Sequence, residues 1–259
     1  MTPNTARTKG TSGAETGRKL LNVLGLFTGA RPAWTVAELA RELGLTTSTA
    51  YRYVGLLREE GFLEPATDNA YRVTARVLDL AGAHTASRTD IVDIAVPVMT
   101  RLRDEIGETV LIARRAGDFA YCVERVESEQ AVRLQFRRGQ AMSLHSGSIP
   151  RTLLAYMPPR ERERYVASVE GQLNSEAHRR LLSAEALDEL ARAGHTESFE
   201  EIDPEIWGCA AAVHAPGGEV LALGTAGPTY RLSAESRRRI QSLITGAARQ
   251  ITDALAVAG

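Results

Sequence analysis

The apolar residues between positions 36 and 61 recur with the spacing of two short helices. In the first helix they fall at i, i+3, i+4 and i+7, and they are Val36, Leu39, Ala40 and Leu43. Gly44 is expected to end this helix, and Thr46 to cap a second one that Gly61 ends. The buried face of the second helix is expected to comprise Ala50, Tyr53, Val54 and Leu57. Two helices joined by so short a turn predict a helix-turn-helix.

Two extended segments, around residues 62–64 and 71–73, follow the second helix. Pro65 and the pair Asp68-Asn69 lie between them, and these residue types are typical of turns. We therefore expect a small β-hairpin, or wing. Together these elements predict a winged helix-turn-helix over residues 17–75.

The segments on either side of this domain have other patterns. Residues 1–16 lack apolar periodicity and are expected to be a disordered tail, either functionless or a basic arm that contacts DNA. Residues 76–90 are expected to form a linker helix. Residues 91–259 are expected to be a second domain, which opens with a helix that continues to Ile106 despite Pro97.

Beyond Thr109 the apolar residues follow the pattern of strands, with helical segments between them. Three strands are predicted at VLIARRAG, FAYCVERV and AVRLQF, and a strand–turn–strand at CAAAVHAPGGEVLALGTAG. The predicted helices are Pro150–Met157, Pro159–Val169, Ala184–Ala193 and a last one with a continuous apolar face from Ile240 to Leu255. This mixture indicates an α+β fold.

Composition narrows the classes of protein. The 259 residues carry a net charge of −1, with 11 basic and 8 acidic side chains in residues 1–88 and 20 basic and 24 acidic ones in the rest. Cys122 and Cys209 form neither a disulfide framework nor a zinc motif, so a cytoplasmic location is expected. No apolar run approaches about 18 residues, so no membrane association is expected. The motifs G-x-S-x-G, P-loop and G-x-G-x-x-G do not occur, and no catalytic residue, cofactor or metal site is expected.

The start of the second helix carries the candidate DNA-binding chemistry. A recognition helix places its N-terminal residues against bases and phosphates in the major groove. Hydroxyl side chains there contact phosphates or merely cap the helix, whereas Arg52 would contact a phosphate or a guanine edge. Arg72 would reach the DNA backbone or minor groove from the wing. The candidate DNA-binding residues are Thr46, Thr47, Ser48, Thr49, Tyr51, Arg52 and Arg72.

Three segments together resemble a known family. The first is TVAELARELGLTTSTAYRYVGLLREEGFLE followed by YRVTARVLDLA, the second is SLHSGSIPRTLLAYMP, and the third is GCAAAVHAPGGEVLALGTAGPTYRLS. In combination they are similar to the IclR family of bacterial transcriptional regulators, over roughly residues 18–257.

The resemblance implies that the C-terminal domain is a GAF-like antiparallel sheet flanked by helices, which binds a small-molecule effector. It implies a site at the loop before the Pro150 helix, the strand that bears Cys209 and the strand before Gly227-Pro228. A helix N-terminus there would suit a carboxylate. We add Trp207 as a residue expected to pack over the pocket mouth. The candidate effector-binding residues are Ser148, Ile149, Trp207, Cys209, Gly224 and Ala226.

Several residues of this site depart from the family pattern. Pro150 and Arg151 stand where the family commonly has Gly and Lys, Ile149 is bulkier than usual, and Gly224 and Ala226 stand where Ser is frequent. We therefore expect an effector that is larger or more apolar than pyruvate, or an unoccupied site. The acidic cluster Glu200, Glu201 and Asp203 is expected to be a solvated loop or a polar wall of the pocket. Cys209 lines the pocket or is simply buried, and His145 is expected to have a packing role.

The sequence therefore predicts a ligand-responsive transcriptional regulator, a repressor that binds operator DNA as a homodimer or homotetramer. Dimer contacts are expected from the linker helix or from the helix that follows it. The alternative is a constitutive DNA-binding protein whose C-terminal domain only oligomerises. A third hypothesis, an enzyme built on the C-terminal domain, has no catalytic constellation to support it.

Overall fold

The computed structural model describes residues 14–86, 89–173 and 175–258. Of these, residues 14–86 belong to one compact unit and residues 89–258 to another. We refer to the first, after the prediction from its sequence, as the DNA-binding unit, and to the second as the C-terminal unit. The predicted disordered tail lies outside the described residues, except that residues 14–16 are the start of a helix rather than part of a tail.

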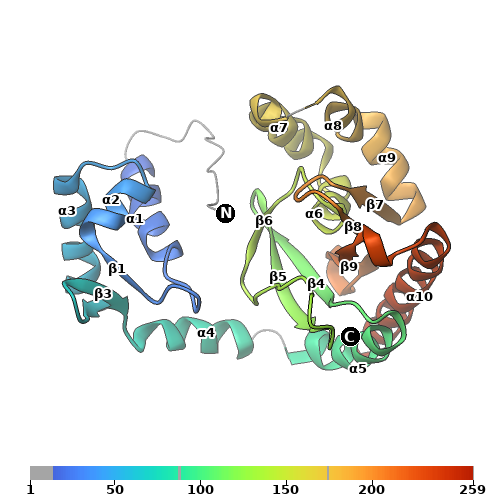
Figure 1. Ribbon diagram of the computed structural model, residues 1–259, viewed down its shortest axis with the longest axis horizontal. Coiled ribbons are helices and arrows are strands. Elements are labelled where there is room, and N and C mark those ends of the chain that lie inside the picture. Colours follow the sequence, from blue (N-terminus) through green and yellow to red (C-terminus); the bar gives the residue numbers. More distant parts are fainter. Residues whose placement is uncertain (1–13, 87–88, 174, 259) are drawn as a thin grey trace. The chain divides into compact units, whose positions relative to one another are not determined.

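The DNA-binding unit contains four helices and a small sheet among its described residues (Figure 1). Its elements are α1 (Ala14–Gly25), β1 (Ala33–Thr35), α2 (Val36–Glu42), α3 (Thr47–Glu59), β2 (Leu63–Pro65), β3 (Ala70–Val73) and α4 (Arg76–Ala86). The three strands pair in the antiparallel order β1-β3-β2. Strands β2 and β3 are the predicted wing, and β1 is an additional strand that the sequence pattern did not reveal.

The core of this unit confirms the predicted helical periodicity. Helix α3 buries the four predicted residues of its inner face, and α2 buries three of its four, with Leu43 packed against the same core. Gly44 has φ of 60°, a left-handed conformation that glycine adopts without steric cost, and it ends α2. The N–H of Leu45 then bonds to the carbonyl of Ala40 at 2.8 Å, which satisfies an orphan carbonyl of the helix.

The C-terminal unit is a six-stranded antiparallel sheet with helices on both faces (Figure 1). Its helices are α5 (Thr89–Ile106), α6 (Ser148–Ala155), α7 (Pro159–Val169), α8 (Glu176–Leu181), α9 (Ala184–Ala193) and α10 (Ala234–Ala258). Its strands are β4 (Val110–Ala116), β5 (Phe119–Val126), β6 (Ala141–Ser143), β7 (His195–Phe199), β8 (Ile206–His214) and β9 (Val220–Pro228). The strand order is β6-β5-β4-β9-β8-β7.

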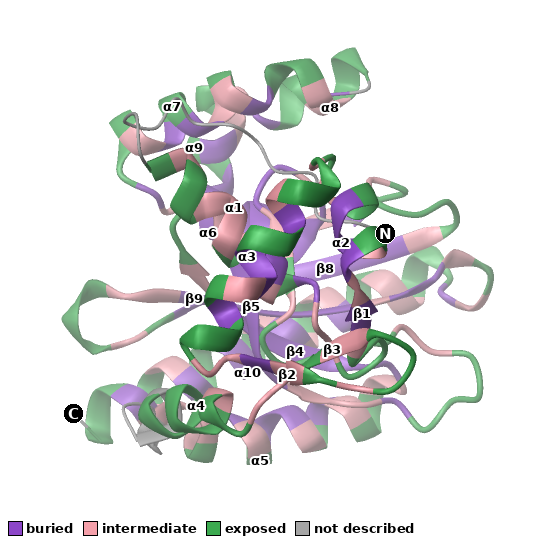
Figure 2. Cartoon of the chain, turned by 90° about the vertical axis from the view of Figure 1, so that its left-hand side faces the viewer, coloured by how far each residue is buried: buried purple, intermediate pink, exposed green. Residues whose placement is uncertain are grey.

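The two faces of this sheet bury separate apolar clusters. Because side chains alternate along a strand, each of β4, β8 and β9 contributes to both. Helices α5 and α10 cover one face, where Ile112, Ala211 and Leu223 are buried. Helices α6, α7 and α9 cover the other face, where Leu111, Ala210 and Ala222 are buried. Figure 2 shows this buried interior as purple segments of β5, β8 and β9.

One predicted strand is wrong. The segment AVRLQF, residues 131–136, is a loop, and the third strand of this region is β6 instead. The alternation of apolar residues suggested a strand with one buried face, but Val132, which would lie on that face, is 63% exposed. Its carbonyls bond to side chains rather than to a neighbouring strand, that of Val132 to Arg231 Nη1 at 2.9 Å and that of Leu134 to Thr109 Oγ1 at 3.1 Å.

Within the described residues, no helix is long and apolar enough to cross a membrane.

Candidate DNA interface and effector site

The first turns of α3 present polar side chains outward. Thr47 and Ser48 are exposed, as is Arg52 one turn later, and Tyr51 is 60% exposed. The residues between them on the helix are anchored in the core, so this face is held on a rigid support. Figure 2 shows the exposed positions of α3 in green, interrupted by its buried ones.

Thr46 and Thr49 have a capping role in this helix. Thr46 is the N-cap residue, and its Oγ1 accepts the N–H of Thr49 at 3.3 Å and lies 2.8 Å from the Thr49 hydroxyl. These two hydroxyls therefore satisfy each other and the helix start. Thr47 and Ser48 remain the hydroxyl-bearing candidates for DNA contact.

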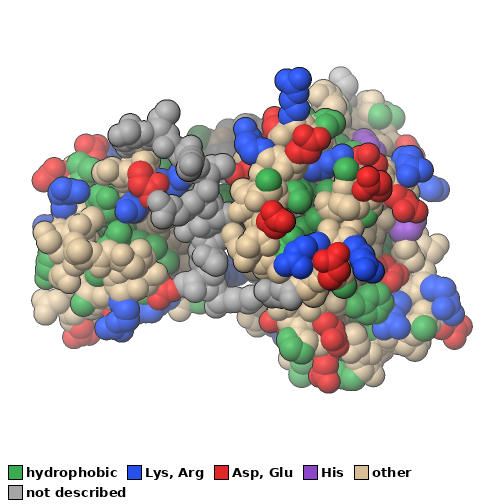
Figure 3. Space-filling view, turned by 90° about the horizontal axis from the view of Figure 1, so that it is seen from above, with side chains coloured by type: hydrophobic (Ala, Val, Ile, Leu, Met, Phe, Trp, Pro, Cys, Tyr) green, Lys and Arg blue, Asp and Glu red, His purple; other side chains and the backbone are tan. Residues whose placement is uncertain are grey.

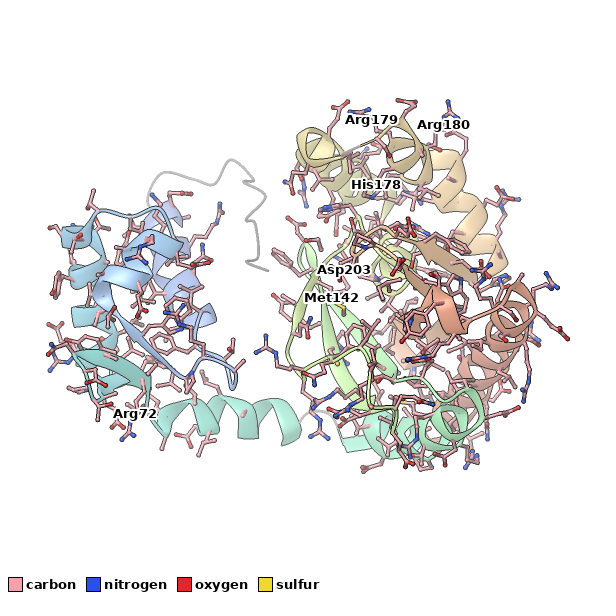
Figure 4. The ribbon with its side chains drawn as sticks, viewed as in Figure 1. Arg72, Met142, His178, Arg179, Arg180 and Asp203 are labelled. Atoms are coloured by element: carbon pink, nitrogen blue, oxygen red, sulfur yellow. The ribbon has the colours of Figure 1, made fainter. Side chains whose placement is uncertain are left out.

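The wing turns at Asp68 and Asn69, both in the left-handed region with φ of 58° and 56°. Such residue types tolerate this conformation, as the sequence predicted. Arg72 lies on β3 and its side chain points outward (Figure 4). Its Nε donates to Glu64 Oε1 on the facing strand at 2.7 Å, so the guanidinium already has a carboxylate partner in this structure.

The α6 region brings together four of the six candidate effector residues. Ser148 and Ile149 begin α6, and both are 4% exposed. Gly224 faces them from β9, because a Cβ atom added there would lie 2.4 Å from Ile149 Cγ1. Gly208, the partner of Ala226 across the sheet, would likewise meet Ser148 Oγ at 2.9 Å. These close approaches mean that Ile149 packs directly on the sheet at Gly224.

Trp207 and Cys209 lie on the opposite face of the sheet, so the expectation that they share a pocket with Ser148 and Ile149 is not met. Side chains alternate along β8, and Gly208 and Ala210 face α6, which turns Trp207 and Cys209 toward α5 and α10. Both are fully buried there. Burial raises the pKa of the Cys209 thiol to about 12, so it stays protonated at neutral pH.

A buried ion pair, which sequence reasoning missed, joins α6 to the loop after β7. Arg151 and Glu201 have side chains that are only 2% and 9% exposed, and Arg151 Nη1 contacts both carboxylate oxygens of Glu201. Glu201 was predicted to lie in a solvated loop or to form a polar wall of the pocket, and its enclosed side chain contradicts the solvated loop. No local pattern indicates this pair, because its members are 50 positions apart.

A second contact anchors the loop that precedes α6. His145 Nδ1 lies 2.9 Å from the hydroxyl of Tyr165 on α7, and His178 Nε2 on α8 lies 2.6 Å from the carbonyl of His145. Burial, and secondarily the nearby His178, lowers the pKa of His145. His145 therefore has the packing role that the sequence suggested, as a tie between the loop and two helices.

Helices α7, α8 and α9 border an open cleft of about 390 Å³. Its apolar lining residues are Val166, Ala167, Leu173, Leu182, Ala184 and Leu187. Arg162 and Arg179 lie at its walls and are already paired, with Asp188 at 2.6 Å and Glu176 at 3.6 Å. Figure 3 shows basic and acidic side chains interspersed over the face that carries α7 and α8.

No group of three or more His, Cys, Asp or Glu side chains in the described part of the chain is placed to hold a metal ion. Each charged cluster described above is instead an ion pair between side chains of opposite sign. The two candidate sites are therefore the exposed face of α3 in the DNA-binding unit and the closely packed junction of α6 with the sheet in the C-terminal unit.

Each of the two units matches the model of a known protein family. Residues 18–66 match the family model of the IclR helix-turn-helix domain, and residues 83–253 match that of the bacterial transcriptional regulator IclR C-terminal domain. The chain is 32% identical over 189 residues to the HTH-type transcriptional regulator KipR of Bacillus subtilis, covering 71% of this chain and 74% of that protein.

Two solved structures share the fold. An IclR family transcriptional regulator from Brucella abortus matches with a TM-score of 0.76 and 22% identity, over 98% of this chain and 99% of that one. An IclR homologue from Microbacterium hydrocarbonoxydans, solved in complex with 4-hydroxybenzoate, matches with a TM-score of 0.68 and 24% identity, over 93% and 99%. The matched family models describe regulators and not enzymes. The chain is a helix-turn-helix transcriptional regulator and belongs to the IclR family.

Proposed function

We propose that this regulator is an effector-responsive repressor that binds double-stranded operator DNA as a homodimer or homotetramer. The observation that carries the DNA-binding part is the outward face of α3, where Thr47, Ser48, Tyr51 and Arg52 are exposed above a buried apolar face. An arginine and short hydroxyls at the start of a rigid helix suit base edges and phosphates in the major groove. From the wing, Arg72 contacts the sugar-phosphate backbone of the DNA.

The linker helix α4 is the better candidate for dimer contacts. Helix α5 already buries Ala95, Met99 and Leu102 against its own unit, so its apolar face is in use. On α4, by contrast, Leu78 and Leu80 are 66% and 61% exposed. Leu78 and Leu80 lie on different sides of α4 because they are two positions apart, and together they leave apolar surface that a second copy would remove from water. A second copy would supply the matching surface, and two recognition helices would then read half-sites about 34 Å apart.

The proposed effector is larger or more apolar than pyruvate and binds in the C-terminal unit. The junction between α6 and β9 supports the apolar part of this proposal, because the side chain of Ile149 occupies the space in front of Gly224, where a polar side chain or a very small acid would otherwise fit. An effector changes operator affinity only as far as it binds the two conformers of the protein differently. An aromatic acid such as 4-hydroxybenzoate is a rational first probe, since a protein of the same fold has been solved with it.

Operator binding with a ligand panel tests the proposal. Fluorescently labelled intergenic DNA flanking the gene is titrated with the protein, alone and with pyruvate, glyoxylate and 4-hydroxybenzoate each at millimolar concentration. Sequence-specific binding that a larger acid weakens by tenfold or more, and that pyruvate and glyoxylate leave unchanged, is the expected result. Tight binding of pyruvate or glyoxylate would overturn the effector class, and activation in a transcription assay would overturn the repressor assignment.

The alternative, a constitutive DNA-binding protein whose C-terminal unit only oligomerises, has one observation in its favour. Ser148, Ile149 and Arg151 at the expected effector site are at most 4% exposed, and Ile149 packs in an apolar cluster while Arg151 is paired with Glu201. If no ligand changes operator affinity, while the Leu78→Asp variant dissociates the oligomer, the regulator is of this constitutive kind.

A further inference from the structure

The C-terminal end of α3 leaves backbone carbonyls that the helix itself does not satisfy. Gly61 ends α3 in the left-handed region, with φ of 71°, and the N–H of Phe62 then bonds to the carbonyl of Leu57 at 2.8 Å. This closure satisfies the last carbonyls inside the helix. The carbonyls of Glu60, Gly61 and Phe62 lie beyond it and need donors from elsewhere.

The start of the linker supplies a donor to each of these carbonyls. The guanidinium of Arg76 donates to the carbonyl of Glu60. The hydroxyl of Thr74 donates to the carbonyl of Gly61 at 2.5 Å, and its N–H donates to that of Phe62 at 3.0 Å. The same hydroxyl accepts the N–H of Arg76 at 3.2 Å, so one side chain joins the end of α3 to the start of α4. We refer to Thr74 and Arg76 as the clasp, and Figure 1 shows it as the short connection where β3 leads into α4.

Two further features favour a guanidinium at this place. The central carbon of the Arg76 guanidinium lies 4.4 Å from the centre of the Phe62 ring, within the range of a cation–π contact. Phe62 in turn packs against the apolar core of the DNA-binding unit. The C-terminal end of a helix also carries a partial negative charge that attracts a cation. Arg76 is therefore held to the end of α3 by a hydrogen bond, by stacking and by charge.

The rest of α4 contributes little to its own position. Among the side chains of α4 that the structure describes none is buried, since Val77 is half-buried and residues 78–83 are all exposed. The helix has 11 residues, so a turn of roughly 10° at the clasp would move its far end by about 3 Å, close to the rise of one base pair. The direction of α4 therefore depends on its first residues.

We propose that the clasp is a positioning device for operator recognition. Thr74 and Arg76 fix the direction of α4 relative to α3, and so set the distance between half-sites that a dimer accepts. This inference rests on the proposed function, in which α3 reads DNA and α4 supplies the dimer contacts.

Arg76 acts in this way without contacting DNA. It binds the C-terminal end of α3, whereas the candidate hydroxyls of Thr47 and Ser48 lie at the other end of a helix of 13 residues, about 20 Å away. A phosphate contact contributes the same affinity at every half-site spacing. A positioning residue contributes only where the spacing of the DNA matches that of the protein, and this difference can be measured.

Operators of altered spacing test the proposal. Arg76→Met removes the donor and the charge from the full-length protein, and α4 should still form because methionine and arginine have similar helix propensities. The probes are the labelled operator from the intergenic DNA, the same operator with two base pairs inserted between its half-sites, and a single half-site. We expect the wild type to prefer the natural spacing roughly 30-fold and Arg76→Met to prefer it roughly threefold or less. The single half-site should bind both proteins equally within about twofold, because the face of α3 is unchanged.

Two control variants and the salt dependence separate positioning from other roles. Arg180→Met removes a basic side chain of the C-terminal unit that is 79% exposed, and it should keep the wild-type preference. Arg76→Lys retains a donor and a positive charge and should recover part of the preference. The slope of log affinity against log salt should be the same in Arg76→Met as in the wild type. A loss of equal size on all three probes, a slope lowered by about one, or an intact preference in Arg76→Met overturns the proposal.

A measurement without DNA separates the clasp from the proposed function. Nitroxide labels at Ser48→Cys and Asp79→Cys, two exposed positions on α3 and α4, report the distance between the helices by double electron–electron resonance. Labelled protein is diluted into an excess of unlabelled protein, and the buried Cys122 and Cys209 should not react. The distance distribution should be roughly twofold broader in Arg76→Met than in the wild type, because few buried contacts hold α4.

Each result of this measurement decides a separate point. Equal widths in the two proteins overturn the clasp. A broader distribution in Arg76→Met, together with no specific operator binding by the wild type, would contradict the proposed function while confirming that the clasp holds α4. If Arg76→Met does not fold, Thr74→Ala, which removes the hydroxyl that joins the two helices, carries both experiments with the same expected results.

Discussion

The two units of this regulator present their candidate functional residues in opposite ways. In the DNA-binding unit Tyr51 is 60% exposed, and the residues around it lie on the open face of α3. In the C-terminal unit Ser148, Ile149 and Arg151 are 4% exposed or less and are already in contact with protein atoms. Recognition of a large partner such as DNA needs an accessible rigid face, whereas recognition of a small ligand needs an enclosed one.

This contrast shows that a ligand in the C-terminal unit has to displace the protein's own side chains, whereas a ligand on the face of α3 does not. The proposed contact of DNA with α3 requires little change in the fold, apart from the exposed pair of Arg72 and Glu64. A ligand at α6 must displace Glu201 or the side chain of Ile149. The four substitutions and one chemical modification described next test this difference, from the largest expected effect to the smallest.

Arg151→Ala should be the most damaging change. It leaves the carboxylate of Glu201 buried without a cation, and breaking a buried pair in this way costs about 3–5 kcal/mol of unfolding free energy. Urea unfolding followed by the fluorescence of Trp207, in a Trp34→Phe background, reports on the C-terminal unit alone, because the chain has two tryptophans. Arg180→Ala, at a 79% exposed side chain 3.8 Å from Glu176, is the control and should cost less than about 0.5 kcal/mol. A small loss for Arg151→Ala would mean that the C-terminal unit is not closed as described.

Gly224→Ser should lower stability by about 1–3 kcal/mol, because the new Cβ would meet Ile149 and the carbonyl oxygen of Cys209 at 2.6 Å. Ile149→Ala removes the side chain that clashes with the new residue. In the double variant Gly224→Ser/Ile149→Ala, the loss of unfolding free energy should therefore be smaller than the sum of the two single losses by about 1 kcal/mol. Ala226→Ser, at a half-buried position of the same strand, is the matched control and should be nearly neutral. Strict additivity would show that Ile149 does not fill the space at Gly224.

Arg52→Ala should weaken operator binding about tenfold and lower the slope of log affinity against log salt by about one, since one phosphate contact is lost. Fluorescence anisotropy with a labelled operator at three salt concentrations measures both quantities. Arg180→Ala removes a basic residue from the other unit and should change neither. An unchanged affinity at every salt concentration would remove Arg52 from the interface.

Glu64→Gln should strengthen operator binding about twofold. The substitution frees the guanidinium of Arg72 from its partner at 2.7 Å and removes a negative charge from the wing, and exposed pairs of this kind are worth only about 0.2–1 kcal/mol. Arg72→Ala in the same assay should weaken binding. If Glu64→Gln weakens binding instead, the pair positions the wing rather than restraining Arg72.

The thiol of Cys209 should be almost inert in the folded protein. Burial holds its pKa near 12, so the reactive thiolate is suppressed at every pH at which the protein is studied, and Cys122 is buried as well. Iodoacetamide at pH 8 should therefore label neither cysteine in native protein and both in urea, as judged by mass spectrometry. Rapid labelling of native Cys209 would indicate an opening of the α5–α10 face of the sheet.

The sequence predicted the DNA-binding unit well because local spacing determines it. The period of Val36, Leu39 and Ala40 and the glycine at position 44 are enough to place α2 and the turn after it. The same reasoning failed at AVRLQF, where alternation around the exposed Val132 suggested a strand. There the backbone bonds to side chains distant in sequence, such as Arg231, and no local pattern reports that.

The candidate effector site was predicted only in part for a related reason. The resemblance placed Ser148, Ile149 and Gly224 near one another, and the close packing of Ile149 on Gly224 agrees with this. It also grouped Cys209 with them, and we added Trp207, although period-two alternation along β8 places these two residues on the far face. The pair of Arg151 and Glu201 depends on tertiary packing, and neither composition nor spacing distinguishes Glu201 from its exposed neighbour Asp203.

The buried pair of Arg151 and Glu201 has a consequence for the kinetics of folding. Its members are 50 positions apart in the chain, one on α6 and one in the loop after β7, and both side chains are enclosed. We expect a contact between segments so distant in sequence to form late in folding, so that it slows unfolding more than it speeds folding.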